Sequence, residues 1–272
     1  MRLQAGCFLG ILLSWLALSH ASTAAEAVRF GANESPPYWT ATLPRNGMGG
    51  EILHAISEEA GLESAIEFAP LSRLIQDDSN NDLGNPVFYM AHQDYAVIIP
   101  ILIYYDALFF YQKDAATVPE FKSLKELEGY RIGALKGTVS GQYYFKQIGI
   151  TLEESYSRES LFKKLRLGRL DICIEIDLVG QDMISKTLPD HATDFSSILI
   201  PGSAQPLAIM IDADDPNAQT LGRRYREGLK RIIENGKYQA ILEKYYGNNP
   251  VPASWYSELR KYGLMYDFGE SE

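Results

Sequence analysis

Cysteine is nearly absent from this sequence. Its 272 residues include two cysteines, Cys7 and Cys173, and Cys7 lies in an N-terminal stretch that we expect to be removed. A chain left with Cys173 alone cannot form an internal disulfide, so its stability must come from a packed core. Cys173 lies in the apolar run 172–174 and is expected to be a small buried side chain.

The sequence also has little positive charge. Its 25 Lys and Arg residues against 35 Asp and Glu residues give a formal net charge of −10. This balance disfavours nucleic acid and anionic membrane surfaces as partners. We therefore expect the partners of this chain to be of another kind.

Familiar cofactor and catalytic patterns are missing as well. His54, His92 and His191 share no metal-ligand spacing. The tripeptide 136–138, Lys-Gly-Thr, does not complete the order of a P-loop. Ser140 does not lie in a G-x-S-x-G elbow, so a hydrolase nucleophile is not expected there. We expect no metal and no cofactor.

The N-terminus has the pattern of a targeting segment. Arg2 precedes an apolar stretch at 8–18, and small residues follow at 21–25. This order is typical of a cleaved secretory signal. Later stretches fall short of the roughly 20 apolar residues of a transmembrane helix. We predict a signal peptide over 1–25, with cleavage after Ala25 or alternatively after Ala21 or Ala27, and a periplasmic mature chain.

Strand-like and helix-like segments alternate through the rest of the chain. Strands are predicted at 28–32, 65–69, 86–90, 97–111 (divided at Pro100 and Asp106), 130–135, 171–176, 197–201 and 206–211. Helices are predicted at 51–60, 71–76, 121–129, 141–147, 160–167, 179–187, 214–234 and 238–246. Residues 77–82 are expected to be a polar loop, and 248–272 a tail that packs on the surface or is partly loose. The alternation predicts an α/β fold in two blocks.

Two stretches are candidates for ligand binding. The strand at 130–135 leads through Gly137 into a helix start with Thr138, Val139 and Ser140. A helix start offers unpaired N–H groups and the positive end of the helix dipole, which suits a carboxylate or another anion.

The other stretch is the loop 33–39, which contains two prolines and then Tyr38 and Trp39. The prolines stiffen the backbone. Two interpretations stay open here: the loop presents an aromatic side chain to a ligand, or it plugs the edge of the core.

Six ordered segments resemble a known family. They are 28–31 with 36–38, 50–53, 100–111, 124–133 with 136–138, 167–171, and 233–247. In that order they resemble the bacterial extracellular solute-binding proteins of family 3, the periplasmic receptors best known for delivering amino acids to ABC transporters. The resemblance runs over 28–247.

The resemblance implies a two-lobed periplasmic-binding-protein type II fold, in which each lobe is a mixed sheet flanked by helices. A two-strand hinge would join the lobes, with crossovers near 109–113 and 204–209. Lobe 1 would comprise 28–110 and 207–265, and lobe 2 would comprise 112–205. A monomer would close around a small ligand by hinge motion.

The resemblance also implies site residues. Gly137, Thr138, Val139 and Ser140 match the lobe-two carboxylate site, whereas the arginine expected across the cleft is absent and Arg73 is its candidate substitute. Tyr89 and His92 match positions that often contact ligand. Glu175 and Asp177 flank the position of the acid that binds an ammonium group, each one residue away. An ordinary α-amino acid held in the usual way is therefore not expected.

The implied function is a non-enzymatic receptor that captures a small polar ligand, amino-acid-like or carboxylate-bearing, for an ABC transporter permease. Two alternatives stay open. One is an enzyme that resembles the cyclohexadienyl or arogenate dehydratases, with Glu175 or His92 as the acid. The other is a co-receptor for a membrane sensor.

Overall fold

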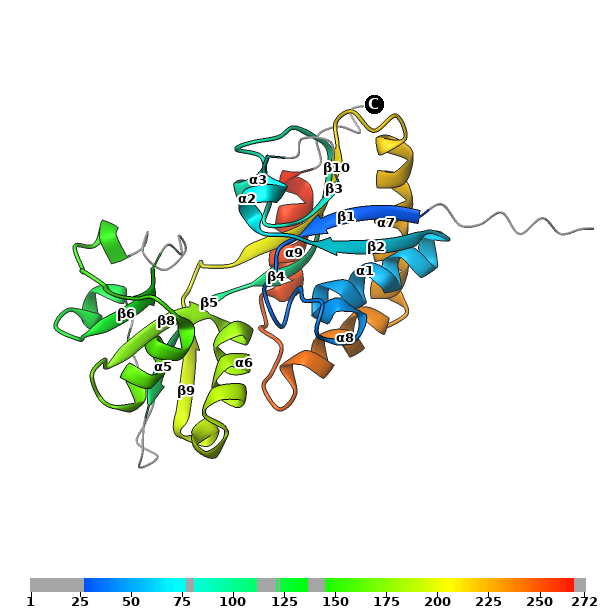
Figure 1. Ribbon diagram of the computed structural model, residues 1–272. Helices are drawn as coiled ribbons and strands as arrows, with labels where there is room; N and C mark the ends of the chain where they lie inside the picture. The colour runs from blue at the N-terminus through cyan, green and yellow to red at the C-terminus, as the bar shows by residue number, and fades with distance from the viewer. Residues whose placement is uncertain (1–26, 77–80, 112–120, 122, 137–144, 267–272) are drawn as a thin grey trace, which may run out of the picture.

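Two five-stranded sheets, each flanked by helices, form the two lobes of the molecule (Figure 1). The computed structural model describes residues 27–76, 81–111, 121, 123–136 and 145–266. Each sheet contains both parallel and antiparallel neighbours. The two-lobed α/β fold with mixed sheets is thereby confirmed.

Lobe 1 is built on the strand order β2-β1-β3-β10-β4. Its strands are β1 Ala27–Ala32, β2 Glu63–Phe68, β3 Asn81–Gly84, β4 Tyr95–Tyr104 and β10 Gln205–Asp212. Its helices are η1 Pro44–Asn46, α1 Gly47–Ala60, α2 Leu71–Leu74, α3 Pro86–Tyr89, α7 Ala218–Glu234, α8 Lys237–Tyr246 and α9 Trp255–Met265. Strand β4 lies at an edge of the sheet, where a proline such as Pro100 removes no ladder bond on its open side.

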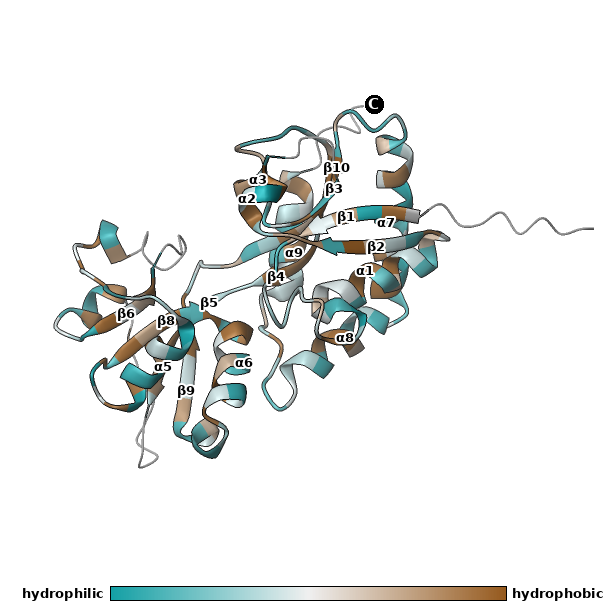
Figure 2. Cartoon of the chain, in the orientation of Figure 1, coloured by the Kyte–Doolittle hydropathy of each residue, from teal (hydrophilic) through white to brown (hydrophobic). Residues whose placement is uncertain are grey.

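Lobe 2 is built on the order β7-β6-β8-β5-β9. Its strands are β5 Asp106–Tyr111, β6 Ile132–Leu135, β7 Glu153–Ser155, β8 Ile172–Ile176 and β9 Phe195–Leu199. Its helices are η2 Leu124–Leu127, α5 Arg158–Arg166, α6 Asp177–Thr187 and η3 Pro189–Asp194. Strand β8 is mostly hydrophobic, whereas the helices show both hydrophilic and hydrophobic residues (Figure 2). Cys173 is fully buried in β8, as its apolar neighbours predicted.

Two chain segments cross between the lobes. The first crossing is at Tyr105, between β4 and β5, and the second runs through 200–204, between β9 and β10. The Ser203 hydroxyl ties them together: it accepts from the Asp106 N–H at 3.1 Å and donates to the Ile200 carbonyl at 2.7 Å. The two-strand hinge is therefore present.

The first crossing comes earlier in the chain than expected. The resemblance implies a crossing near 109–113, but β5 pairs with β8 and β9 from Asp106 onward. Residues 106–110 thus belong to the second sheet, not the first. The second crossing ends at Ala204, where the expected one began. The run 97–111 is apolar on both sides of Asp106, so its composition does not show where the chain passes from the first sheet to the second.

The predicted strand at 86–90 is wrong. Pro86 opens the short helix α3, and the Asn85 side chain accepts the Val87 N–H at 2.9 Å, which caps that helix. The strand lies instead at 81–84, and its first two residues fall inside the polar loop expected at 77–82. Its polar residues have hydrogen-bond partners from other strands: Tyr95 donates to Asp82 Oδ2 at 2.8 Å, and Asn81 Oδ1 accepts the Asp212 N–H at 3.0 Å.

The C-terminal segment packs into the structure as helix α9. Trp255 is fully buried and donates from Nε1 to the Tyr238 hydroxyl at 3.0 Å. Helix α9 also braces both crossings, because the Tyr262 hydroxyl donates to the Ala204 carbonyl at 2.6 Å and Ser254 lies 3.0 Å from the Tyr105 hydroxyl. The segment is thus part of the lobe 1 core as far as Tyr266.

Candidate functional site

A small cavity of about 150 Å³ lies where the two lobes meet. Lobe 1 supplies the loop after β1, the region around α2 and α3, and the two strands next to the hinge. Lobe 2 supplies Ile176, the last residue of β8. The lining residues are Asn33, Ser35, Tyr38, Trp39, Leu71, Gly84, Asn85, Phe88, Tyr89, Tyr104, Ile176 and Leu207. We call this space the interlobe cavity.

The loop after β1 is fixed against helix α1. Ser35 and Trp39 exchange two backbone hydrogen bonds, and the carbonyls of Pro37 and Tyr38 accept from the first N–H groups of α1 at 2.9 Å each. Those N–H groups have no partner within their own helix, so the loop satisfies them. Tyr38 and Trp39 are each 1% exposed and also line the interlobe cavity. Both side chains therefore belong to the lobe 1 core and also form part of the cavity wall.

Trp39 depends on a glycine for its position. A Cβ atom at Gly49 would lie 2.6 Å from the Trp39 ring, so a larger residue there would displace the indole. Gly49 is in the first turn of α1, where the chain approaches the loop closely. The glycine at position 49 therefore creates space that the tryptophan ring fills.

Two residues of the cavity wall each carry a buried polar atom that has no hydrogen-bond partner in the described part of the chain. These atoms are Nε1 of Trp39 and the hydroxyl of Tyr89, whose residues are 1% and 2% exposed. Burial raises the pKa of Tyr89, so its hydroxyl stays protonated and can donate. Buried donors are normally paired, and each exception calls for a physical explanation. A ligand with acceptor atoms in this cavity would supply one.

Asn85 and Tyr104 are the satisfied polar residues of the same wall. Asn85 Nδ2 donates to the Tyr104 hydroxyl at 2.8 Å while its Oδ1 caps helix α3. These bonds hold Tyr89 one helical turn further along α3, over Gly84, whose Cβ would lie 2.5 Å from the tyrosine ring. The turn at Asn85-Pro86 thereby sets the position of the unpaired hydroxyl.

Asp177 joins the lobes beside the cavity. It is the first residue of α6 in lobe 2 and is 1% exposed. From lobe 1, Tyr38 donates to its Oδ1 and Tyr246 to its Oδ2, both at 2.8 Å. Burial raises the pKa of Asp177, although the two tyrosine hydrogen bonds oppose that rise. We call Asp177 with Tyr38 and Tyr246 the interlobe latch.

Glu175 is also occupied within the protein. Its Oε2 accepts from Arg158 Nε at 2.6 Å, and its Oε1 accepts the Ile176 N–H at 2.9 Å. The acids at 175 and 177 were expected near a ligand ammonium group, but the structure brings neither to the cavity wall. Ile176, which lies between them, occupies that wall instead. Alternation along β8 sets this arrangement, because neighbouring strand residues face opposite sides.

The remaining candidate residues fall outside the interlobe cavity. Arg73 is exposed on α2 and lines a separate hollow with Arg29 and Glu67. His92 is exposed after α3 and is not part of the wall. Gly137, Thr138, Val139 and Ser140 lie outside the described residues. The structure therefore brings together Tyr38, Trp39 and Tyr89.

Several wall residues carry no obvious signal in the sequence. Asn85 could have been recognised from the Asn-Pro pair that starts a short helix. Ile176 could have been found by the alternation of β8. Ser35, Leu71 and Tyr104 become neighbours through the fold and could not have been chosen from their local sequence.

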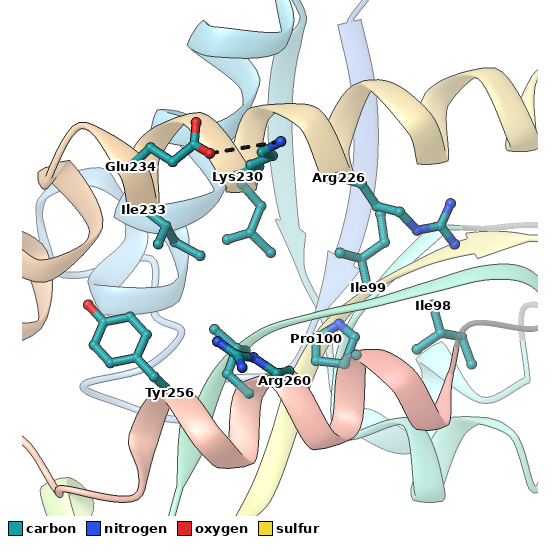
Figure 3. A pocket seen from close by; sticks show the side chains of 12 residues that line it. Ile98, Ile99, Pro100, Arg226, Lys230, Ile233, Glu234, Tyr256 and Arg260 are labelled. Atoms are coloured by element: carbon teal, nitrogen blue, oxygen red, sulfur yellow. Dashed lines mark ion pairs between the residues drawn. The ribbon is translucent and has the colours of Figure 1, made fainter.

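A larger hollow of about 410 Å³ lies on the outside of lobe 1 (Figure 3). Helices α7 and α9 form its sides, and residues 98–100 of β4 lie at its base. Arg226, Lys230 and Arg260 stand along it, and Lys230 pairs with Glu234 at 3.8 Å. This groove belongs to a single lobe. The interlobe cavity is smaller, but it has buried unpaired donors and walls from both lobes, which makes it the better candidate.

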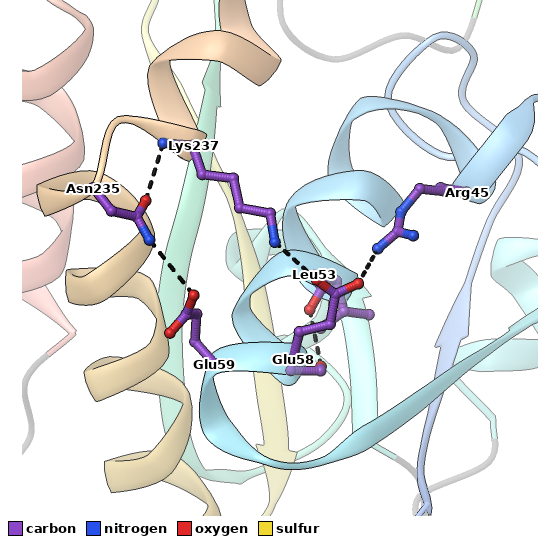
Figure 4. Close-up of polar contacts among 7 residues, drawn as sticks. Arg45, Leu53, Glu58, Glu59, Asn235 and Lys237 are labelled. Carbon is purple, nitrogen blue, oxygen red and sulfur yellow. Dashed lines mark hydrogen bonds and ion pairs between the residues drawn. The ribbon is translucent and has the colours of Figure 1, made fainter.

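Another hollow, of about 430 Å³, lies between α1 and α8. Glu58 accepts hydrogen bonds there from Lys237 at 2.8 Å and from Arg45 (Figure 4). The hydrogen bond from Lys237 is the main cause of a lowered pKa of Glu58, and the bond from Arg45 lowers it further. The charged groups at this hollow are paired with one another and exposed, which is typical of a solvated helix surface.

Neither a membrane helix nor a metal cluster was found among the described residues. No helix there combines the length and apolarity that crossing a bilayer requires. Nor does that part of the chain bring three His, Cys, Asp or Glu side chains together as metal ligands.

Sequence comparisons found no relatives, but structural comparison did. No protein-family model matches the chain, and no curated protein matches it by sequence. A histidine kinase sensor domain with similarity to periplasmic binding proteins is 19% identical, with a TM-score of 0.59 over 82% of this chain and 97% of the other. The arginine-, lysine-, histidine-binding protein ArtJ of Geobacillus stearothermophilus is 18% identical, with a TM-score of 0.57 over 86% and 100%.

A third structure extends the same picture. The second substrate-binding domain of a putative amino acid ABC transporter from Streptococcus pneumoniae is 17% identical, with a TM-score of 0.57 over 80% of this chain and 99% of that domain. At these identities the likeness shows a shared fold. The fold expected from the six sequence segments, that of amino-acid solute-binding proteins, is thus confirmed over most of the chain.

Proposed function

We propose that this protein is a periplasmic solute-binding receptor that encloses a small polar ligand between its lobes by hinge closure. The observation that carries the proposal is the interlobe cavity, whose wall includes Trp39 and Tyr89, each with a buried donor that finds no partner in the described part of the chain. An unpaired buried donor costs free energy that a ligand acceptor recovers. In a receptor, the Trp39 N–H and the Tyr89 hydroxyl would gain acceptors when ligand replaces water, which would explain why both groups are present.

The hinge and the latch support the same function. Two chain crossings, tied by Ser203, permit rotation of one lobe against the other. The hydroxyls of Tyr38 and Tyr246 reach across to Asp177, so the lobes are in contact beside the cavity. Opening would break these bonds and expose the cavity, and closure would bury a ligand. An ABC-type permease would then recognise the closed form.

A sensory role is the second candidate, and the likeness to a histidine kinase sensor domain favours it. In that role the closed receptor would signal to a membrane partner without releasing its ligand. A dehydratase would instead need an acid poised over its substrate. The described part of the cavity wall contains no acidic side chain, so we do not favour an enzyme.

The test is a thermal-shift and calorimetric screen of small polar solutes with a variant that fills the cavity. Leu71→Trp adds an indole at the cavity wall, from a residue that is itself 36% exposed. Val87→Trp is the matched control, because Val87 is 59% exposed nearby and does not line the cavity. We expect ligands to stabilise the wild type and Val87→Trp but not Leu71→Trp. Equal binding by all three would place the site elsewhere.

A further inference from the structure

The hollow between α7 and α9 on the outside of lobe 1 has the size of a small-molecule site (Figure 3). We call it the α7–α9 groove. Its volume of about 410 Å³ lies within the range of about 300–1,000 Å³ that is usual for ligand pockets. Half of its twelve lining residues have aliphatic side chains: Ile98, Ile99, Pro100, Leu229, Ile233 and Leu259. A ligand that fits this lining needs an apolar body.

The charged side chains of the groove are mostly positive. Arg226 and Lys230 come from α7 and Arg260 from α9, and Glu234 is the single acid among the described residues of the lining. Three cations and one anion give this lining a formal charge of +2, in a chain whose formal charge is −10. Positive charge is therefore concentrated here against the balance of the molecule, which favours an anionic group on the ligand.

The acids of the surrounding elements are paired with other cations. Strand β4 contains no acid, and Glu234 of the lining pairs with Lys230 at 3.8 Å. The remaining acids of α7 and α9 lie outside the lining and have their own partners: Glu227 with Arg231 at 3.8 Å, and Glu258 with Lys261 at 2.9 Å. In the described part of these elements no acid pairs with Arg260, so its exposed guanidinium is open to a carboxylate.

Helix α9 forms one side of this groove and is held firmly. The resemblance to the solute-binding receptors ends at residue 247, before α9 begins at Trp255. Trp255 is fully buried, and the Tyr262 hydroxyl donates to the Ala204 carbonyl at 2.6 Å. The side that α9 presents to the groove is therefore in place before a ligand arrives, which lowers the cost of binding.

From the apolar lining, the local positive charge and the fixed side, we infer that the α7–α9 groove is a second binding site, which takes a free single-chain amphiphile with a carboxylate head. The hydrocarbon chain packs on residues 98–100, and the carboxylate pairs with Arg260. The groove has roughly 2.7 times the volume of a cavity of about 150 Å³ that holds benzene, so a ligand of about 12 to 16 non-hydrogen atoms fits. It shares no lining residue with the interlobe cavity, so the inference is independent of the proposed receptor function.

The probe is decanoate, whose size is in this range, titrated by calorimetry into the full mature chain below its micellar concentration. We expect decanoate to bind about five- to tenfold tighter than octanoate, because each buried methylene tightens binding by about fourfold at most. Decylammonium has the same chain and the opposite charge, and it should bind at least about fivefold more weakly than decanoate. Equal binding of decanoate and either of the other two would overturn the inference.

Two substitutions on α9 test where the hydrocarbon chain lies. Gly263 lines the groove, and a Cβ atom there would have open space around it, so Gly263→Trp puts an indole into the groove. Leu264→Trp is the matched control, because Leu264 is 73% exposed and is not part of the lining. We expect Gly263→Trp to abolish decanoate binding and Leu264→Trp to keep it, with circular dichroism to check that both are folded. Equal binding by the two variants would overturn the inference.

A second pair of variants tests where the carboxylate lies. Arg260→Gln should weaken decanoate binding about three- to fivefold, the usual range for an exposed ion pair. Lys261→Gln removes the neighbouring cation, which does not line the groove, and should change the affinity by less than about twofold. Equal losses in the two variants would mean attraction by surface charge alone and would overturn the inference.

The variant Leu71→Trp, which fills the interlobe cavity, separates this site from the receptor function. It should bind decanoate as the wild type does. Loss of binding in Leu71→Trp, with binding kept in Gly263→Trp, would place decanoate in the interlobe cavity. That result would overturn this inference and leave the receptor function standing.

Other occupants of the groove would give different results, and each would overturn the inference. Sedimentation of the protein with phosphatidylglycerol vesicles, without binding of soluble decanoate, would mean a membrane surface. Binding that requires Asp267→Asn, Glu270→Gln and Glu272→Gln together would mean that the groove holds this acidic segment of the chain itself. A dimer that Gly263→Trp dissociates, without decanoate binding by the wild type, would mean a second copy.

Discussion

The interlobe latch offers a direct measurement of what holds the lobes together. Tyr246→Phe removes one hydroxyl and changes nothing else in the side chain. That hydroxyl donates to Asp177 Oδ2 at 2.8 Å inside the protein. A hydrogen bond to a charged group contributes about 1.5–3 kcal/mol to stability. We therefore expect the free energy of unfolding to fall by about 2 kcal/mol at neutral pH.

The size of this effect depends on burial, which the control tests. The Tyr256 hydroxyl donates to Gln239 Oε1 at 2.7 Å, a similar distance, but Tyr256 is 39% exposed. In Tyr256→Phe water replaces the lost partner, so we expect a change within about 0.5 kcal/mol. Urea unfolding followed by circular dichroism measures both variants.

A second readout reports on the lobes themselves. Small-angle scattering of ligand-free Tyr246→Phe should give a larger radius of gyration than the wild type, because the closed arrangement has lost one of its two latch bonds. If Tyr246→Phe unfolds at the same urea concentration as the wild type, with the same slope, the latch does not stabilise the lobes. Our assignment of Asp177 would then be refuted.

Three further predictions concern the cavity, the buried acid and the packing of lobe 2. Tyr89→Phe should leave the ligand-free protein as stable as the wild type or up to about 1 kcal/mol more stable, and should weaken ligand binding about tenfold. Urea unfolding measures the stability and calorimetry measures the binding. A loss of stability in the ligand-free variant would count against an unpaired Tyr89 hydroxyl. Burial raises the folded-state pKa of Asp177 above its unfolded value, so the stability that this shift contributes is greatest below the ordinary aspartate pKa and is lost as pH rises through the raised value. The unfolding free energy of the wild type minus that of Asp177→Asn should therefore increase as pH is lowered from 7 toward 4. A difference that does not change with pH would contradict the raised pKa. Gly180→Ala would place a Cβ 2.2 Å from the Phe109 ring and should cost about 1–3 kcal/mol in urea unfolding, whereas Gly263→Ala in helix α9, with open space around it, should not destabilise; equal effects would contradict the packing.

The fold could be predicted from the sequence because its signals are local. The alternation of strands and helices, the glycine that ends α1 and the amphipathic pattern of α7 are each read within a few turns of chain. Strand β3 failed for the opposite reason. Asn81 and Asp82 look like loop residues, and only Tyr95 and Asp212, which are distant in the chain, make them acceptable in a buried strand.

The candidate site could be predicted in part. Tyr38 and Trp39 follow two prolines at the end of a strand, and such a loop indicates a fixed aromatic surface. The roles of Glu175 and Asp177 could not be predicted, because their partners Arg158 and Tyr246 are 17 and 69 residues away. The local sequence does not distinguish an acid that faces a cavity from an acid that accepts hydrogen bonds from the other lobe.

The most direct test of the account is the nuclear magnetic resonance signal of the Trp39 indole N–H. In the ligand-free protein that group is buried and has no partner among the residues that the structure describes, whereas the Trp255 indole already donates to Tyr238 at 3.0 Å. Trp39→Phe and Trp255→Phe assign the two signals. We predict that a solute which raises the melting temperature will shift the Trp39 signal downfield, as a new hydrogen bond forms, and leave the Trp255 signal in place. A stabilising solute that leaves the Trp39 signal unmoved would contradict a ligand site in the interlobe cavity.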